Sequence, residues 1–356
     1  MNKIALLSSL QDDVWHDQAA HDAFESWHFD ALSDDGQEAV TVTFYDNYPF
    51  SPRYVTHAAR EKRVRSEVPK RFPAVSFTYS CEGKVRMCAV NEFSQDNFSA
   101  SKTEPICRIA GSSFHAEAAD YGSGFVVKLD LVTSKQRRIK AELEWVTIEK
   151  DLAQASPPEG PTTAHSWNIA APRSDVSGRM ELIRHSGGVE KTVHFRGTGY
   201  HDQFRSECSL TRTMWQRCWG RAHYVDSTVL FQHLTSSSST DSYASLIVIR
   251  DGSIDEHEAK CIIGKTFRDR FGLLVPRRMS ITCPAGAELR IETLETVRSG
   301  FFQVKMLGEM TLKFGDGPAK KTTGILELIA PGRLRNPAAR WFSDLGIAKN
   351  GKPPLF

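Results

Sequence analysis

The feature that most constrains the fold is an alternation of apolar and polar side chains that recurs along the chain. Residues 39–46 read AVTVTFYD and place Val40, Val42 and Phe44 on one face, with two threonines on the other. Residues 124–132, GFVVKLDLV, alternate in the same way. Successive side chains of a β-strand point to opposite sides, so a period of two indicates strands with one face on a core.

Turn sequences separate these strand-like runs at short intervals. Long helical patterns that alternate with strands are missing, which argues against a doubly wound nucleotide-binding fold. Frequent turns between short strands are typical of antiparallel meanders that close into barrels or sandwiches, so we predict an all-β chain. The turn sequences are SDDG (33–36), CEGK (81–84), HSGG (185–188), RDGS (250–253), PAGA (284–287) and FGDG (314–317).

The length of the chain predicts two domains. At 356 residues it exceeds the size at which a single hydrophobic core usually stops growing. Residues 151–164, DLAQASPPEGPTTA, are rich in proline and small polar residues and lack periodicity, as a linker does. We therefore predict β-rich domains over 1–155 and 156–356. Residues 336–347 predict a short C-terminal helix, with Pro337 in its first turn.

Composition and motif content argue against several classes of function. The formal net charge of +2 is too small to indicate nucleic acid as a partner, and no run approaches the roughly 20 apolar residues of a membrane span. No P-loop, no helix-opening GxGxxG and no HxxxH zinc motif occurs, so we expect neither a cofactor nor a metal. Seven scattered cysteines and the lack of a signal sequence predict a reducing, cytoplasmic setting, while a homo-oligomer stays possible.

Two short segments carry side chains that are suited to proton chemistry. In HSWNIAAP, an extended chain puts His165 and Trp167 on the same side. In GTGYHD, Tyr200 and Asp202 share one side of a strand and His201 faces the other. Both pairs would fit one cavity. The structural alternative is a core tryptophan, a buried histidine with satisfied hydrogen bonds and an aspartate in a turn, and the pattern alone leaves both interpretations open.

Five stretches carry a family resemblance, namely SWHFDALSDDG (26–36), TFYDNYPFSPRY (43–54), HSWNIAAPRSDVSG (165–178), GTGYHD (197–202) and WGRAHYVDSTVLFQH (219–233). Together, and in this order, they resemble the carotenoid 1,2-hydratase family, whose relatives include Diels–Alderase-type cyclases and other lipocalin-like proteins. No single stretch is a signature, but the ordered set is fairly specific. The resemblance implies two lipocalin-like β-barrel domains packed together, in agreement with the two β-rich halves.

The resemblance also implies functional positions in this chain. The family's His-x-Trp and Tyr-x-Asp positions fall on His165, Trp167, Tyr200 and Asp202. The family usually continues Asp-His-Asn-Trp-Gly, whereas this chain reads QFRS over 203–206. It also has His28 where an aromatic pair is usual. These departures bear on the reaction and on the shape of the pocket more than on the fold.

The expected function is cofactor-independent catalysis on a hydrophobic isoprenoid or polyene-like molecule, by acid-assisted hydration or cyclisation of a C=C bond, in an apolar pocket between the domains. Asp202 is the expected acid, because burial disfavours the carboxylate anion. Tyr200 would bond to Asp202 or to the substrate, and His165 would accept a proton from incoming water. The expected substrate-binding residues are Trp167, Trp27 and Trp219, of which the last two are also candidates for the core.

Two other functions stay open at this stage. A pericyclase of the Diels–Alderase type would fold a polyene into a reactive shape, with Tyr200 or His165 polarising a carbonyl. A non-catalytic carrier would hold a lipophilic ligand and release it unchanged, as β-barrels of this kind often do.

Overall fold

A computed structural model describes residues 3–60, 70–119, 122–154, 164–237 and 241–355. Of the described residues, 61% lie in strands, which confirms the predicted all-β class. Contacts divide the molecule into two compact units, each discontinuous in sequence. The half-barrel unit comprises the described residues within 4–151, 164–209 and 340–356, and the barrel unit comprises those within 1–3, 152–163 and 210–339.

This division does not follow the linker expected from the sequence. The strands directly after it pair with strands of the N-terminal half, so they belong to the half-barrel unit. Most of the expected linker, residues 155–163, lies outside the described residues. That the segments 1–155 and 156–356 are domains of their own stays a prediction.

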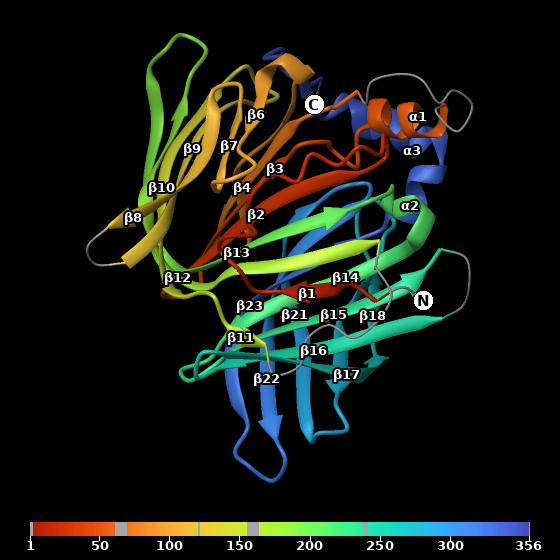
Figure 1. The fold of residues 1–356 in the computed structure, drawn as a ribbon. Coiled ribbons are helices and arrows are strands. Elements are labelled where there is room, and N and C mark those ends of the chain that lie inside the picture. Colours follow the sequence, from red (N-terminus) through yellow and green to blue (C-terminus); the bar gives the residue numbers. More distant parts are fainter. Residues whose placement is uncertain (1–2, 61–69, 120–121, 155–163, 238–240, 356) are drawn as a thin grey trace. The chain divides into compact units, whose positions relative to one another are not determined.

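The half-barrel unit is a curled sheet of 13 strands, shown in Figure 1. Its order is β24-β5-β4-β3-β2-β13-β12-β10-β9-β8-β7-β6, and β1 pairs with β12. The strands are β1 (Ala5–Leu7), β2 (Phe24–Ser33), β3 (Glu38–Tyr45), β4 (Ala74–Cys81), β5 (Lys84–Glu92), β6 (Phe98–Ala100), β7 (Ile106–Ile109), β8 (Ser112–Ala119), β9 (Gly122–Val132), β10 (Arg138–Glu149), β12 (His165–Ile183), β13 (Val189–Ser206) and β24 (Ala348–Lys349).

The barrel unit closes on itself through eight strands. They run in the order β17-β16-β15-β14-β23-β22-β21-β20, and a pairing between β17 and β20 completes the ring. The strands of the ring are β14 (Met214–His223), β15 (Thr228–Ser236), β16 (Ser242–Arg250), β17 (Ser253–Ile263), β20 (Arg278–Thr282), β21 (Ala287–Ser299), β22 (Gln303–Phe314) and β23 (Lys320–Ile329). Outside the ring, β11 (Ala153–Gln154) pairs with β17, and β18 (Thr266–Arg268) and β19 (Leu274–Pro276) form a separate ribbon.

The described helices are short. They are α1 (Pro52–Arg60), α2 (Leu210–Thr213) and α3 (Pro337–Leu345), with 3₁₀ turns η2 (Gln95–Asn97) and η3 (Pro331–Arg335). The predicted C-terminal helix is confirmed as α3. At its start, Asn336 Oδ1 accepts hydrogen bonds from the backbone N–H groups of Ala338 and Ala339 at 2.9 and 3.3 Å. Such a side chain satisfies N–H groups that have no partner within the helix.

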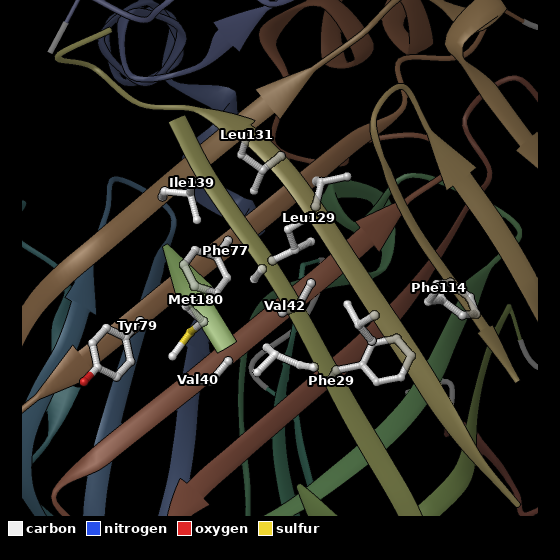
Figure 2. Packing of buried hydrophobic residues seen from close by; sticks show 14 of the residues in the cluster. Phe29, Val40, Val42, Phe77, Tyr79, Phe114, Leu129, Leu131, Ile139 and Met180 are labelled. Atoms are coloured by element: carbon white, nitrogen blue, oxygen red, sulfur yellow. The ribbon is translucent and has the colours of Figure 1, made fainter. Parts of the chain in front are cut away.

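Apolar side chains of the half-barrel sheet gather on one of its faces, as the alternation predicts. Figure 2 shows part of this cluster, with Phe29, Val42, Phe77, Phe114 and Leu129. All five are at most 3% exposed. Burial of this surface is the main contribution to the stability of the sheet, at about 25 cal/mol for each Å² of apolar area.

The interior of the closed barrel is packed in the same way. Phe231, Leu246, Val304 and Leu328 are completely buried and belong to one apolar cluster. In small eight-stranded barrels the interior is just wide enough for side chains to fill it. The expected lipocalin-like architecture is therefore confirmed, with one unit closed and the other open as a half-barrel.

Candidate functional site around Asp202

The motif GTGYHD lies in the middle of the half-barrel sheet, where β13 pairs with β12 on one side and β2 on the other (Figure 1). Its second glycine is required by close packing. A Cβ at Gly199 would lie 2.6 Å from Trp145 Nε1 and 2.8 Å from Asp30 O, closer than real Cβ atoms come. The glycine lets β2 and Trp145 approach β13 just before Tyr200.

The alternation predicted for this motif is confirmed. The ring of His201 lies parallel to that of Phe29 at 3.8 Å, in the apolar cluster. Residues on either side of a histidine in a strand face the opposite way, so Tyr200 and Asp202 lie on the second face of the sheet. Both are buried there, at 0% and 3% exposed.

Asp202 accepts a hydrogen bond from a neutral donor, since Trp167 Nε1–H lies 2.8 Å from Asp202 Oδ2. Burial raises the pKa of Asp202. A positive charge on His28, the bond from Trp167 and the nearby Tyr200 hydroxyl oppose this rise. The balance favours a carboxyl group that keeps its proton at higher pH than an exposed aspartate does.

His165 lies on the same face of the sheet as Trp167. It pairs with Ser206 across β12 and β13, and its Nδ1 lies 2.8 Å from Ser206 Oγ. Ser206 Oγ donates to the carbonyl of Cys208 at 2.5 Å, so the imidazole Nδ1–H donates to Ser206. The ring also stacks on Phe204 at 5.8 Å between centroids. His165, Trp167, Tyr200 and Asp202 therefore share one face, as expected.

Three further polar side chains belong to this face, and sequence reasoning did not assign them to the site. His28 pairs directly with Asp202, and Asp30 pairs with Tyr200. His28 Nε2 lies 3.2 Å from Asp30 Oδ2, and His28 Nδ1 lies 2.9 Å from Thr43 Oγ1 on β3. The signal in the sequence is the alternation of β2 itself, which places residues 26, 28 and 30 on the face away from the apolar cluster.

The other two tryptophans that the sequence analysis expected to bind substrate, Trp27 and Trp219, do not share the face of Asp202 in the half-barrel unit. Trp27 belongs to the apolar cluster on the opposite face, where its ring lies 5.7 Å from that of Phe114. Trp219 lies in β14 of the barrel unit and donates a hydrogen bond from Nε1 to Glu327 Oε2 at 3.0 Å. The roles of Trp27 and Trp219 in substrate binding stay predictions.

The run that departs from the family pattern makes contacts of its own. Gln203 Nε2 donates to the carbonyl of Val14 at 2.7 Å and to Glu25 Oε2 at 3.2 Å. Its neighbour His201 lies 2.8 Å from Asp13 Oδ2 through Nε2. On this side of β13, Gln203 of the departing sequence therefore holds the segment that precedes β2. On the face of Asp202, the same run supplies Phe204 and Ser206, which contact the ring of His165.

Two hollows are present elsewhere on the molecule. One, of about 430 Å³, is lined by His16, Gln18, Ala19, Ala20, Arg205 and Glu207 of the half-barrel unit. The other, of about 420 Å³, lies on the barrel unit beside Ile262, Arg278 and Glu292. Asp202 lines neither of them, so an enclosed apolar pocket beside Asp202 stays a prediction. Among the described residues, no group of histidine, cysteine and acidic side chains is arranged to hold a metal ion.

Comparison with known proteins gives relatives along nearly the whole chain. No family model matches. A protein of Chlorobaculum tepidum named hydroxyneurosporene dehydrogenase is 20% identical over 361 residues, which cover 97% of this chain and 92% of that protein. The predicted resemblance is confirmed. A likeness at this identity indicates a distant relative, and what it implies about activity is taken up as a proposal below.

Solved structures with the same fold are also known. A Nitrosomonas europaea structure described as AttH aligns with a TM-score of 0.60 and 16% identity over 89% of this chain and 94% of its own. CghA in complex with Sch210972 aligns with a TM-score of 0.57 and 12% identity over 93% of this chain and 94% of its own. At such identities, the likeness establishes the lipocalin-like fold.

No helix in the part of the chain that the structure describes has both the length and the apolar character of a membrane span.

Proposed function

We propose that this chain is an enzyme that acts on a hydrophobic polyene or isoprenoid-like molecule, with Asp202 as its acid. The observation that carries the proposal is a carboxyl group buried inside the protein, whose pKa burial raises, and which accepts a hydrogen bond from Trp167. The class of substrate is supported by the Chlorobaculum tepidum relative, whose name refers to hydroxyneurosporene.

The favoured reaction is hydration of a C=C bond. The π electrons of the alkene take the proton of Asp202, which forms a C–H bond and leaves a cation on the adjacent carbon. A lone pair of water then forms the C–O bond, and the extra proton of that oxygen passes to His165 or returns to the Asp202 carboxylate. No electrons are gained or lost overall, so the product is an alcohol with the mass of substrate plus water.

The residues around Asp202 suit this step physically. A carbon base is very weak, so the acid must still carry its proton near neutral pH, which burial favours. Trp167 contacts Asp202 through its indole edge. An aromatic face beside the developing cation would add roughly 0.5–2 kcal/mol of attraction in a dry site.

Cyclisation without water is the second candidate. It is favoured by the neutral donor at Asp202, because the hydrogen bond from Trp167 Nε1–H holds Asp202 Oδ2 in place. A fixed acid could bond to a carbonyl of the substrate and leave the polyene folded in a reactive shape, so that the rate gain comes from proximity. A carrier without catalysis is the third candidate.

Isotope incorporation tests these functions against one another. Neurosporene is the probe, and it is incubated with the full chain in water labelled with ¹⁸O and, separately, in deuterated water. Hydration predicts a product that contains one solvent oxygen and one deuterium bound to carbon. Neurosporene has no carbonyl group, so cyclisation is tested with a polyene that carries one, and it predicts a product of unchanged mass. A carrier returns either probe unchanged. Mass spectrometry of apolar molecules that co-purify with the chain identifies the natural ligand in parallel.

A further inference from the structure

We infer that His28 is a positioning residue for Asp202, and that its contacts with Asp30 and Thr43 hold its titratable ring next to the proposed acid. The inference rests on the proposed function only in treating Asp202 as the acid. His28 was not among the site residues expected from the sequence. It stands where the family resemblance has an aromatic side chain.

The register of the sheet places these groups together. His28 of β2 and Asp202 of β13 are direct cross-strand partners. The Cβ atoms of such a pair lie about 4.5–5.5 Å apart on the same face. His28 is 6% exposed and Asp202 is 3% exposed. Water therefore screens the interaction between their charges poorly.

The imidazole ring is held from both sides. His28 Nδ1 lies 2.9 Å from Thr43 Oγ1, and His28 Nε2 lies 3.2 Å from Asp30 Oδ2. A carboxylate can only accept, so an ionised Asp30 accepts a hydrogen bond from His28 Nε2–H. The Thr43 hydroxyl can donate to a neutral Nδ1 or accept from a protonated one. The same geometry thus accommodates both the neutral ring and the imidazolium without any movement of the side chains.

The charge of this ring acts on the carboxyl group beside it. A positive His28 favours the anionic form of Asp202 and therefore lowers its pKa, against the effect of burial. Other titratable groups of the half-barrel unit lie near Asp202 or on its face: Tyr200 and His201 on β13, Asp30 on β2, Asp13 before β2 and His165 on β12. His28 differs from them because it is directly opposite Asp202 on a neighbouring strand and both of its ring nitrogens have contacts, with Thr43 and Asp30.

Nuclear magnetic resonance of the full chain tests the inference without any substrate. The protein is labelled with ¹³C at the side-chain carboxyl carbon of aspartate, and the Asp202 signal is assigned as the one missing in Asp202→Asn. Its titration is followed in the wild type, in His28→Gln and in His28→Asn, which is the second variant should glutamine not be tolerated. The matched control is His115→Gln, because His115 Nε2 bonds to Glu117 two residues on, at 2.8 Å, as His28 does to Asp30.

We expect the titration midpoint of Asp202 to move to higher pH in the His28 variants and to stay unchanged in His115→Gln. An unchanged midpoint of Asp202 in both His28 variants would overturn the inference.

The outcome for His28 is separate from the outcome for the proposed function. A wild-type Asp202 that titrates like an exposed aspartate would remove the proposed acid. The shift between wild type and His28→Gln would still report whether His28 controls this carboxyl group.

Discussion

The two faces of β13 bury acidic groups in different ways. On one face, Asp202 accepts a hydrogen bond from the neutral indole of Trp167 and lies opposite His28. On the other face, Asp13 lies 2.8 Å from the ring of His201 and is completely buried. Burial raises the pKa of both carboxyl groups.

The two faces differ in whether the hydrogen-bond partner of the buried acid can exchange a proton with it. The His201 ring is stacked on Phe29, and its Nδ1–H donates to the carbonyl of His28 at 3.0 Å. Its other nitrogen shares a proton with Asp13, so this pair serves to join the segment before β2 to the sheet. A neutral donor leaves the proton of Asp202 available for transfer. Equal burial thus yields a structural pair on one face and a candidate acid on the other.

The largest expected effect separates the two acids by activity. Asp202→Asn removes the transferable proton and should lower turnover of the substrate by roughly 10²–10⁴-fold, the usual contribution of a general acid. Asp13→Asn lies on the other face and should leave turnover within a few-fold of the wild type. Rates are measured at equal concentrations of folded protein. Asp251→Asn is the control, since the side chain of Asp251 is 89% exposed.

Equal loss of turnover in the two buried variants would contradict the division of roles between the faces. Retained turnover in Asp202→Asn alone would show that another group supplies the proton.

The second effect concerns stability, and here the larger change is expected on the face of His201 and Asp13. His201→Ala removes a stacked ring from the apolar cluster and leaves Asp13 buried without its partner. Loss of one member of a buried pair costs about 3–5 kcal/mol in the free energy of unfolding. The same substitution at His115, whose side chain is 33% exposed, should cost about 0.5 kcal/mol or less. Denaturant unfolding followed by fluorescence measures both, and similar midpoints for the two variants would contradict a structural role for His201.

Part of this arrangement was predictable from the sequence because it is local. A period of two places Tyr200 and Asp202 together and His201 opposite, whatever strands lie beside β13. The same logic placed His165 beside Trp167. The glycines of the turns follow as well: Gly36 and Gly252 have φ angles of 70° and 74°, which non-glycine residues rarely adopt.

The rest depended on strand pairing between distant residues, which a single sequence does not reveal. His28 reaches Asp202 only because β2 pairs with β13, across 174 positions of the chain, with a register in which these two residues are opposite. A shift of the register by one residue would have placed Trp27 opposite Asp202, on the face where the sequence analysis expected it. The units also could not be read from the linker, since β12 and β13 return to the N-terminal sheet.

The last expected effect is a dependence of the free energy of unfolding on pH, which arises from the buried carboxyl group of Asp46. Asp46 accepts hydrogen bonds from the backbone of Glu25 and from Arg71, and burial raises its pKa from 3.8 to about 7. Between these values the folded state binds more protons than the unfolded state. The free energy of unfolding should therefore fall as the pH rises from about 4 to 7, by at most about 1.4 kcal/mol per pH unit for this group.

Thermal unfolding at closely spaced pH values measures this slope. Asp46→Asn removes the titrating group and should flatten the curve, while Asp251→Asn, at an exposed position with a positive φ that asparagine tolerates, should leave it unchanged. The pKa values of Asp13 and Asp202 are also raised, so these groups change the free energy of unfolding with pH in the same direction. Asp46→Asn should therefore reduce the slope and not abolish it. Stability that increases with pH over this interval would mean that Arg71 outweighs burial, and that Asp46 is ionised in the folded protein.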